Sequence, residues 1–204
     1  MHRCSVVPFV VLVFAVGAVG ACSDGSEDGS DRAWPGDGGP AATVDLGAGL
    51  EAELPEGWEV GEITGSTDSL PSEVPADCRS LRGSLSPGDD QPPLDLQLNS
   101  TGCAGLEPVD QIGNGYHGTY VAIDDVQDPT DVDEHEATAG TLVTFSQDYF
   151  ECTNECNDYD DHVGLLTLTA PPDPAFPTLT ILDPRGERSF PELLALADAI
   201  TPAA

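Results

Sequence analysis

The sequence predicts an α+β domain, a mainly antiparallel sheet with a C-terminal amphipathic helix packed on it. Three observations lead to this class. Apolar residues recur at alternate positions in short segments, as expected of half-buried strands. Turn-forming residues separate several of these segments. Helical spacing of apolar residues occurs near the C-terminal end, after the strands, and this segregation is typical of α+β domains.

The first strand signals lie in segments 44–54 and 94–98. Even positions in both segments are apolar, so each strand would bury one face. These positions are Val44, Leu46, Leu50, Ala52, Leu54, Leu94, Leu96 and Leu98. Segment 119–123 is also strand-like in composition.

Segments 141–150 and 163–169 are rich in β-branched residues, leucine and aromatic residues. The stretch between them contains Cys152 and Cys156, so we predict a hairpin with a disulfide at its tip. A further strand is predicted over 178–182. It ends at the turn residues 183–186.

The predicted helix follows that turn. Ser189 and Glu192 have the spacing of a capping box, and Pro191 is tolerated in a first turn, where no amide donor is needed. Apolar residues then share one predicted face. They are Leu193, Leu194, Ala197 and Ile200.

The N-terminal segment has the features of an export signal. A basic start precedes an apolar run that is too short to span a bilayer, so we predict removal of residues 1–21. Val19, Gly20, Ala21 and Cys22 resemble the lipobox of bacterial lipoproteins. The resemblance implies cleavage before Cys22 and fatty acylation of its sulfur. The mature protein would then be anchored on the outer face of the cytoplasmic membrane.

The rest of the chain divides into two parts. Residues 22–42 are so rich in Gly, Ser, Asp and Pro that they are predicted to form a flexible acidic tether. Residues 43–204 are long enough for one globular domain with its own core. We expect this domain to be monomeric.

The charge of the chain restricts its partners. It has 37 Asp and Glu residues against 6 Lys and Arg, a formal net charge of −31 at pH 7, and contains no lysine. Such a field repels phosphate backbones, so we expect no nucleic-acid partner. The arginine-only, Ala-, Gly-, Pro- and Val-rich composition suggests an actinobacterial source.

Four cysteines remain after the signal and the lipid acceptor are set aside: Cys78, Cys103, Cys152 and Cys156. An even number outside the cytosol predicts disulfides, and four cysteines allow three pairings. We favour Cys152–Cys156 with Cys78–Cys103, because the first pair is close enough to join across a tight turn.

The Leu54-Pro55-Glu56-Gly57-Trp58 segment, together with the order of later strands and a last helix, resembles the PsbP-like fold of exported lipoproteins. The resemblance covers residues 43–204 and implies a binding or accessory role. It carries over no functional residues. The predicted disulfides and the Pro-rich insertion at 87–93 depart from the family pattern.

Familiar catalytic motifs are not found. Residues 113–118 fit G-x-G-x-x-G, but a strand-like segment follows where a dinucleotide fold needs a helix. The lack of lysine excludes P-loop and Schiff-base chemistry. His117, His135 and His162 have no metal-protease spacing and are expected in solvated loops. We therefore assign no catalytic residue.

Two acidic segments, 124–136 and 151–161, are expected to be solvated loops. Neither fits the EF-hand pattern, which needs glycine at loop position six. The metal is unknown, and the candidate calcium ligands are Asp158, Asp160 and Asp161.

These observations predict a membrane-anchored envelope lipoprotein with a non-enzymatic binding or accessory domain, whose protein or small-molecule ligand is unknown. Two alternatives remain open. One is an envelope hydrolase that uses a pair of carboxylates. The other is a structural lipoprotein that responds to divalent ions.

Overall fold

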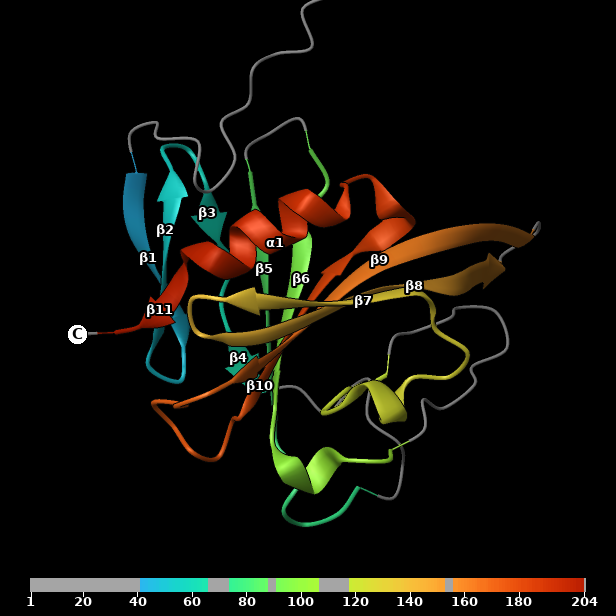
Figure 1. The fold of residues 1–204 in the computed structure, drawn as a ribbon, viewed down its shortest axis with the longest axis horizontal. Helices are drawn as coiled ribbons and strands as arrows, with labels where there is room; N and C mark the ends of the chain where they lie inside the picture. The colour runs from blue at the N-terminus through green and yellow to red at the C-terminus, as the bar shows by residue number, and fades with distance from the viewer. Residues whose placement is uncertain (1–40, 66–73, 88–90, 107–117, 153–155, 204) are drawn as a thin grey trace, which may run out of the picture. The chain divides into compact units, whose positions relative to one another are not determined.

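A computed structural model describes residues 41–65, 74–87, 91–106, 118–152 and 156–203 (Figure 1). For residues 150–152 and 156 it describes the backbone alone. The predicted signal, the lipobox, the tether up to residue 40, His117 and most of the G-x-G-x-x-G segment lie outside these ranges. The sequence predictions for those segments therefore stay predictions.

The described strands form two antiparallel sheets. The small sheet has the order β1-β2-β11. Its strands are β1 (Ala41–Gly47), β2 (Leu50–Pro55) and β11 (Ile200–Pro202). The large sheet has the order β3-β5-β6-β10-β9-β8-β7, with β4 also paired to β5 (Figure 1). Its strands are β3 (Glu59–Val60), β4 (Thr64–Gly65), β5 (Ser80–Ser86), β6 (Leu94–Asn99), β7 (Thr130–Ala137), β8 (Gly140–Cys152), β9 (Cys156–Leu168) and β10 (Thr178–Asp183).

The helical elements of the described part are short. They are η1 (Thr101–Cys103), η2 (Ile123–Asp125), η3 (Pro184–Gly186) and α1 (Phe190–Ala199). The coarse fold prediction, α+β with mostly antiparallel sheet and one C-terminal helix, is therefore confirmed. No helix within the described ranges has the length and apolar character that crossing a bilayer requires.

Each face of the large sheet carries its own hydrophobic cluster, because neighbouring residues of a strand point to opposite faces. The first cluster contains Leu96 of β6 and Ile181 of β10, which are register partners. Leu193 and Leu196 of α1 belong to the same cluster, as does Leu50 of the small sheet. This cluster is the larger of the two among the described residues, so its burial removes more apolar surface from water.

The second cluster lies on the opposite face. Phe145 of β8 and Val163 of β9 are register partners and fully buried. Tyr120 and Val126, which come from the segment between η1 and β7, are buried with them. This segment, residues 118–126, therefore covers part of the second face of the sheet.

The strand predictions agree with the structure at 44–54, 94–98 and 178–182, and the predicted hairpin is β8–β9. The strand predicted at 119–123 is wrong, because this segment is irregular and leads into η2. The described fold begins at Ala41, two residues before the predicted domain start.

The helix prediction needs correction at one end. Ser189 is the N-cap, and its amide and hydroxyl donate to the Glu192 carboxylate at 2.6 and 2.7 Å. However, α1 ends at Ala199, and Ile200 begins β11. The buried positions of the helix are Leu193, Leu196 and Ala197, whereas Leu194 is only partly buried.

Both acidic segments predicted as loops contain strands. Residues 130–137 form β7, the exposed edge of the large sheet, and residues 156–161 are the first part of β9. Neither stretch has apolar alternation: the residues of β7 are mostly exposed, and the buried position at the end of the β9 stretch is the carboxylate of Asp161. Charged residues on an edge also oppose pairing with another chain.

Candidate functional site

The candidate site lies on the second face of the large sheet, where polar side chains replace apolar ones. Arg82 of β5 is the register partner of Gln97 of β6, and Gln97 is that of Thr180 of β10. Thr180 in turn lies opposite Leu165 of β9. This row therefore changes from apolar at β9 to polar at β10, β6 and β5. The apolar end belongs to the second cluster, which includes Leu165.

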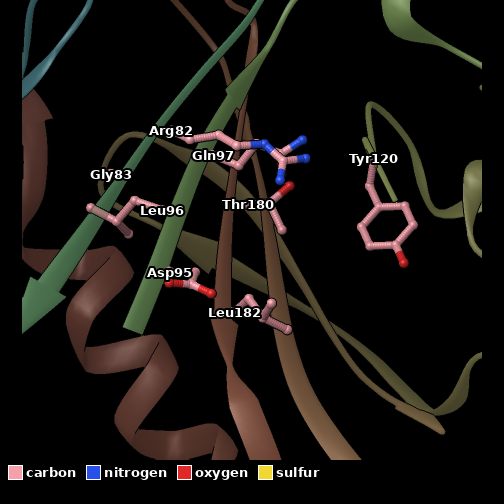
Figure 2. Close-up of a pocket in the computed structure, with 8 residues that line it drawn as sticks. All are labelled: Arg82, Gly83, Asp95, Leu96, Gln97, Tyr120, Thr180 and Leu182. Carbon is pink, nitrogen blue, oxygen red and sulfur yellow. The ribbon is translucent and has the colours of Figure 1, made fainter. Parts of the chain in front are cut away.

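A cavity of about 170 Å³ lies at the polar end of this row (Figure 2). Figure 2 shows the Arg82 guanidinium and the Thr180 hydroxyl directed toward the side where Tyr120 lies. The cavity is lined by Arg82, Gly83, Asp95, Leu96, Gln97, Tyr120, Thr180 and Leu182.

Arg82 is the most unusual of these residues. Its Nε and Nη2 atoms are buried, and no atom of the described residues accepts a hydrogen bond from either. Burial lowers the pKa of Arg82, and the nearby Asp95 carboxylate partly opposes this effect. A guanidinium remains protonated under these conditions. The cavity lining therefore contains a positive charge, two of whose donor nitrogens have no acceptor among the described residues.

Thr180 adds a third group of this kind. The residue is 4% exposed, and its hydroxyl has no hydrogen-bond partner among the described residues. Gln97 differs, because its amide nitrogen donates to Asn99 Oδ1 at 2.9 Å. Buried polar groups in native proteins nearly always have partners, so unpaired ones indicate a bound water, ion or ligand.

Tyr120 forms the opposite wall and is itself held firmly. Its hydroxyl donates to Gln147 Oε1 at 2.5 Å and accepts from the Gly118 amide at 3.2 Å. Its ring meets Phe145 edge-on, with 6.1 Å between centroids. Burial raises the pKa of Tyr120, so the phenol remains neutral. The ring presents an apolar surface to the cavity.

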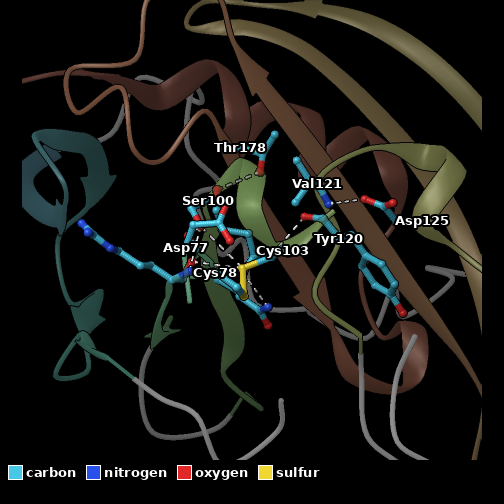
Figure 3. The surroundings of a disulfide bond; sticks show 11 residues. Asp77, Cys78, Ser100, Cys103, Tyr120, Val121, Asp125 and Thr178 are labelled. Atoms are coloured by element: carbon cyan, nitrogen blue, oxygen red, sulfur yellow. Dashed lines mark hydrogen bonds between the residues drawn. A yellow bond between two sulfur atoms is a disulfide. The ribbon is translucent and has the colours of Figure 1, made fainter. Parts of the chain in front are cut away.

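The segment that carries Tyr120 is fixed by side chains from both sides. Asn99 Nδ2 donates to the Tyr120 carbonyl at 3.0 Å. The Asp125 carboxylate accepts from the amides of Val121 and Ala122, each at 3.0 Å, and from the Gly105 amide at 2.7 Å (Figure 3). The wall of the cavity is therefore positioned without a ligand.

The Cys78–Cys103 disulfide joins the chain just before β5 to η1, just after β6 (Figure 3). Its Cα atoms are 4.5 Å apart. Beside it, Ser100 Oγ accepts from the Arg79 amide at 2.7 Å and donates to the Asp77 carbonyl at 3.0 Å. This half of the predicted pairing is confirmed. It ties together the ends of the two strands that carry Arg82 and Gln97.

The other predicted pair is placed only in part. The backbones of Cys152 and Cys156 are register partners at the end of the β8–β9 hairpin. Their side chains lie outside the described part of the structure. The register is what a disulfide across the hairpin needs, so this pairing stays a prediction.

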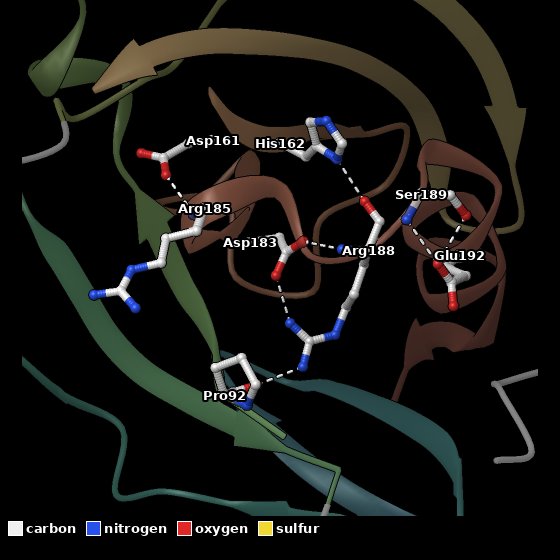
Figure 4. Close-up of polar contacts among 8 residues, drawn as sticks. All are labelled: Pro92, Asp161, His162, Asp183, Arg185, Arg188, Ser189 and Glu192. Carbon is white, nitrogen blue, oxygen red and sulfur yellow. Dashed lines mark hydrogen bonds and ion pairs between the residues drawn. The ribbon is translucent and has the colours of Figure 1, made fainter. Parts of the chain in front are cut away.

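A second polar cluster lies where β9 and β10 approach the start of α1 (Figure 4). Asp183 is fully buried and forms an ion pair with Arg188, whose backbone amide also donates to it at 2.5 Å. Asp161 is 1% exposed and accepts from the Arg185 amide at 2.7 Å. Burial raises the pKa of Asp161 to about 6. These carboxylates hold the η3 turn, which contains Arg185 at φ 71°. We interpret the cluster as structural.

The candidate metal ligands do not converge. Asp158 and Asp160 are two residues apart on β9, so they share one face of the strand, and both are exposed. Asp161 is the next residue and is buried on the opposite face. Within the described residues, no group of three or more His, Cys, Asp or Glu side chains is placed to hold a metal ion.

The two described histidines are not in solvated loops, and that prediction is wrong. His135 lies on β7 and His162 on β9. The His162 Nδ1 atom is 2.5 Å from the Arg188 carbonyl, and its ring lies 4.5 Å from that of Phe190. His162 therefore packs against the start of α1.

Sequence reasoning missed every polar residue of the cavity. Arg82, Gln97 and Thr180 belong to three strands and meet only through the pairing of β5, β6 and β10. A partial signal was present, because Gln97 and Thr180 interrupt the composition of otherwise buried strands. No family model matches the chain, and comparisons with curated proteins and with solved structures give no match either.

Proposed function

We propose that this chain is a lipid-anchored protein of the bacterial envelope whose domain binds a small oxygen-containing ligand in the cavity beside Arg82. One observation carries the binding site: two buried guanidinium nitrogens of Arg82, Nε and Nη2, have no hydrogen-bond acceptor among the described residues. Hydrogen bonds from a charged donor are about twice as strong as neutral ones. A carboxylate or a similar acceptor would satisfy both groups at once.

A binding role fits the cavity better than a catalytic one. Among the described residues that line the cavity, the only acidic side chain is Asp95, and none is a histidine, cysteine or serine. The Thr180 hydroxyl has no hydrogen-bond partner among the described residues, so no general base is paired with it there. Arg82 and Thr180 can hold a ligand, and Tyr120 can cover it.

The anchor is proposed from the sequence. The apolar run that ends at Val19, Gly20 and Ala21, followed by Cys22, supports cleavage and lipid attachment. We also propose that α1 packs on the large sheet, which is supported by the membership of Leu193 and Leu196 in the cluster of the first face. The second face, with the cavity, would then remain free for the ligand.

The experiment has one arm for the anchor and one for the site. Cys22→Ser should abolish acyl labelling and leave the precursor uncleaved or release the protein from membranes. Continued acyl labelling of a mature-length product would contradict the anchor. In the second arm, the wild-type protein is titrated with small carboxylates and neutral amides of the same size. Melting temperature should rise with the carboxylates. No change with any of them would contradict the binding site.

A further inference from the structure

The cavity contains two opposite charges at different depths. The Arg82 guanidinium has its Nε and Nη2 atoms buried, whereas Asp95 is an exposed residue of the same lining. Asp95 lies on the same face of β6 as Gln97, the register partner of Arg82. The two charges are therefore diagonal neighbours on adjacent strands. No ion pair joins them in the described structure within the 4.0 Å that such a contact requires.

The charge of the whole chain limits which ligand can enter. A formal net charge of −31 repels a free anion over a distance set by the Debye length. A simple carboxylate must approach Arg82 against this field. A ligand that also has a positive charge carries no net charge and avoids most of this repulsion.

Size and shape limit the ligand further. A cavity of about 170 Å³ is smaller than the sites that hold drug-sized molecules and is comparable to one that holds benzene. The ligand would therefore have about six non-hydrogen atoms. Leu182 and the ring of Tyr120 give the cavity an apolar part that suits a methyl or methylene group.

We propose that the cavity binds a small zwitterion of the amino-acid class, with its carboxylate on Arg82 and Thr180 and its ammonium group on Asp95. This inference rests on the proposed function, since it assigns a ligand class to the same site. The carboxylate accepts from Nε and Nη2 of Arg82 and from the Thr180 hydroxyl. The ammonium group donates to Asp95 at the cavity mouth, where water also reaches it.

The test is isothermal titration of the detergent-purified processed protein with three probes of similar size. L-Alanine carries both charges, propionate lacks the ammonium group, and L-alaninamide lacks the carboxylate. L-Alanine should bind most tightly. Losing either charge should lower affinity by about tenfold, which is typical of one charged hydrogen-bonded contact.

Two variants assign the charges, and each has a matched control. Arg82→Gln should weaken L-alanine and propionate alike. Asp95→Asn should reduce L-alanine to the affinity of propionate and leave propionate unchanged or slightly improved. The controls are Arg79→Gln and Glu53→Gln, which remove the same charges from exposed residues outside the cavity. Neither control should change the order of the probes.

The outcomes separate this inference from the proposed function. If L-alanine and propionate bind equally and Asp95→Asn has no effect, the zwitterion is wrong and the binding site stands. If L-alaninamide binds as well as L-alanine in wild type and in Arg82→Gln, the assignment of the carboxylate is wrong. If none of the three probes binds, the cavity holds ordered water only, and both proposals fail.

Discussion

The ligand-binding role proposed for Arg82 implies a cost in stability when no ligand is present. A buried donor without a partner costs about 1 to 3 kcal/mol, and two nitrogens of the Arg82 guanidinium have no acceptor within the described part of the chain. Residues with this property are typical of sites whose partner is supplied by a ligand. The stability of the ligand-free protein should therefore improve when the charge is removed.

This reasoning predicts the effect of Arg82→Met, which keeps much of the side-chain length and removes the donors. The free energy of unfolding without ligand should rise by about 1 kcal/mol, because the unpaired donors are gone. Urea denaturation measures it. Arg79→Met at an exposed position is the control and should change little. A loss of stability in Arg82→Met alone would mean that the guanidinium has stabilising partners in the folded protein.

Asp161 makes the second prediction at the residue scale. Burial raises its pKa from 3.8 to about 6 in the folded protein. The folded state therefore binds this proton more tightly than the unfolded chain does. The contribution of Asp161 to the free energy of unfolding is therefore largest below pH 3.8, the pKa in the unfolded chain. It decreases as the pH rises from 3.8 to about 6.

The variant Asp161→Asn cannot ionise, and its side-chain oxygen can still accept from the Arg185 amide. Near pH 4 the variant and the wild type should have similar free energies of unfolding. At pH 7 the variant should be more stable than the wild type by about 2 kcal/mol. Thermal unfolding across this range measures the difference. Asp158→Asn removes the same charge from an exposed residue of the same strand and is the control. A difference that does not depend on pH would contradict the assignment.

At the scale of elements, the disulfide and the strand register hold the cavity. Cys78 and Cys103 are 25 residues apart, so their bond closes a long loop around β5 and β6. Cys152 and Cys156, if bonded, close a short loop at a hairpin end. The entropy that a disulfide removes from the unfolded chain increases with loop length.

Replacing Cys78 and Cys103 together by serine should therefore lower the free energy of unfolding by about 3 kcal/mol. The same double replacement at Cys152 and Cys156 should lower it less. Chemical denaturation of the two variants, with mass spectrometry for free thiols, makes the comparison. A larger loss at the hairpin would show that its tip contributes more than loop closure.

The sequence predicts elements well where one face is buried. Leu94, Leu96 and Leu98 alternate because β6 lies between β5 and β10 with its apolar side on the first cluster. Prediction from the sequence fails at β7, where a loop was expected, because the residues of this strand are mostly exposed and show no apolar alternation. The cavity is a different case. Arg82 and Thr180 are brought together by strand order, and a single sequence contains no direct record of which strands pair.

At the scale of the whole molecule, charge is the dominant property. Removal of Arg3 with the predicted signal makes the chain one unit more negative than −31. Folding brings these charges together, so repulsion opposes it. The Debye length decreases from about 30 Å at 0.01 M salt to about 8 Å at physiological salt.

Melting temperature should therefore increase with sodium chloride over this range, because screening weakens the repulsion. Calcium and magnesium chloride at matched ionic strength are the controls for a specific site. Equal melting temperatures in the two salts would leave only the general effect. A rise in calcium alone, abolished by Asp158→Asn with Asp160→Asn, would support the ion-responsive alternative.

An arginine-selective NMR spectrum tests the binding site most directly. The six basic residues are all arginines and Arg3 precedes the predicted cleavage site, so the processed protein should give few side-chain Nε–H signals. The signal of Arg82 is the one that disappears in Arg82→Gln. On adding L-alanine, this signal should shift progressively to saturation while those of Arg79 and Arg185 remain in place. An Arg82 signal that stays unchanged by L-alanine and by propionate would contradict the claim that this guanidinium binds a ligand.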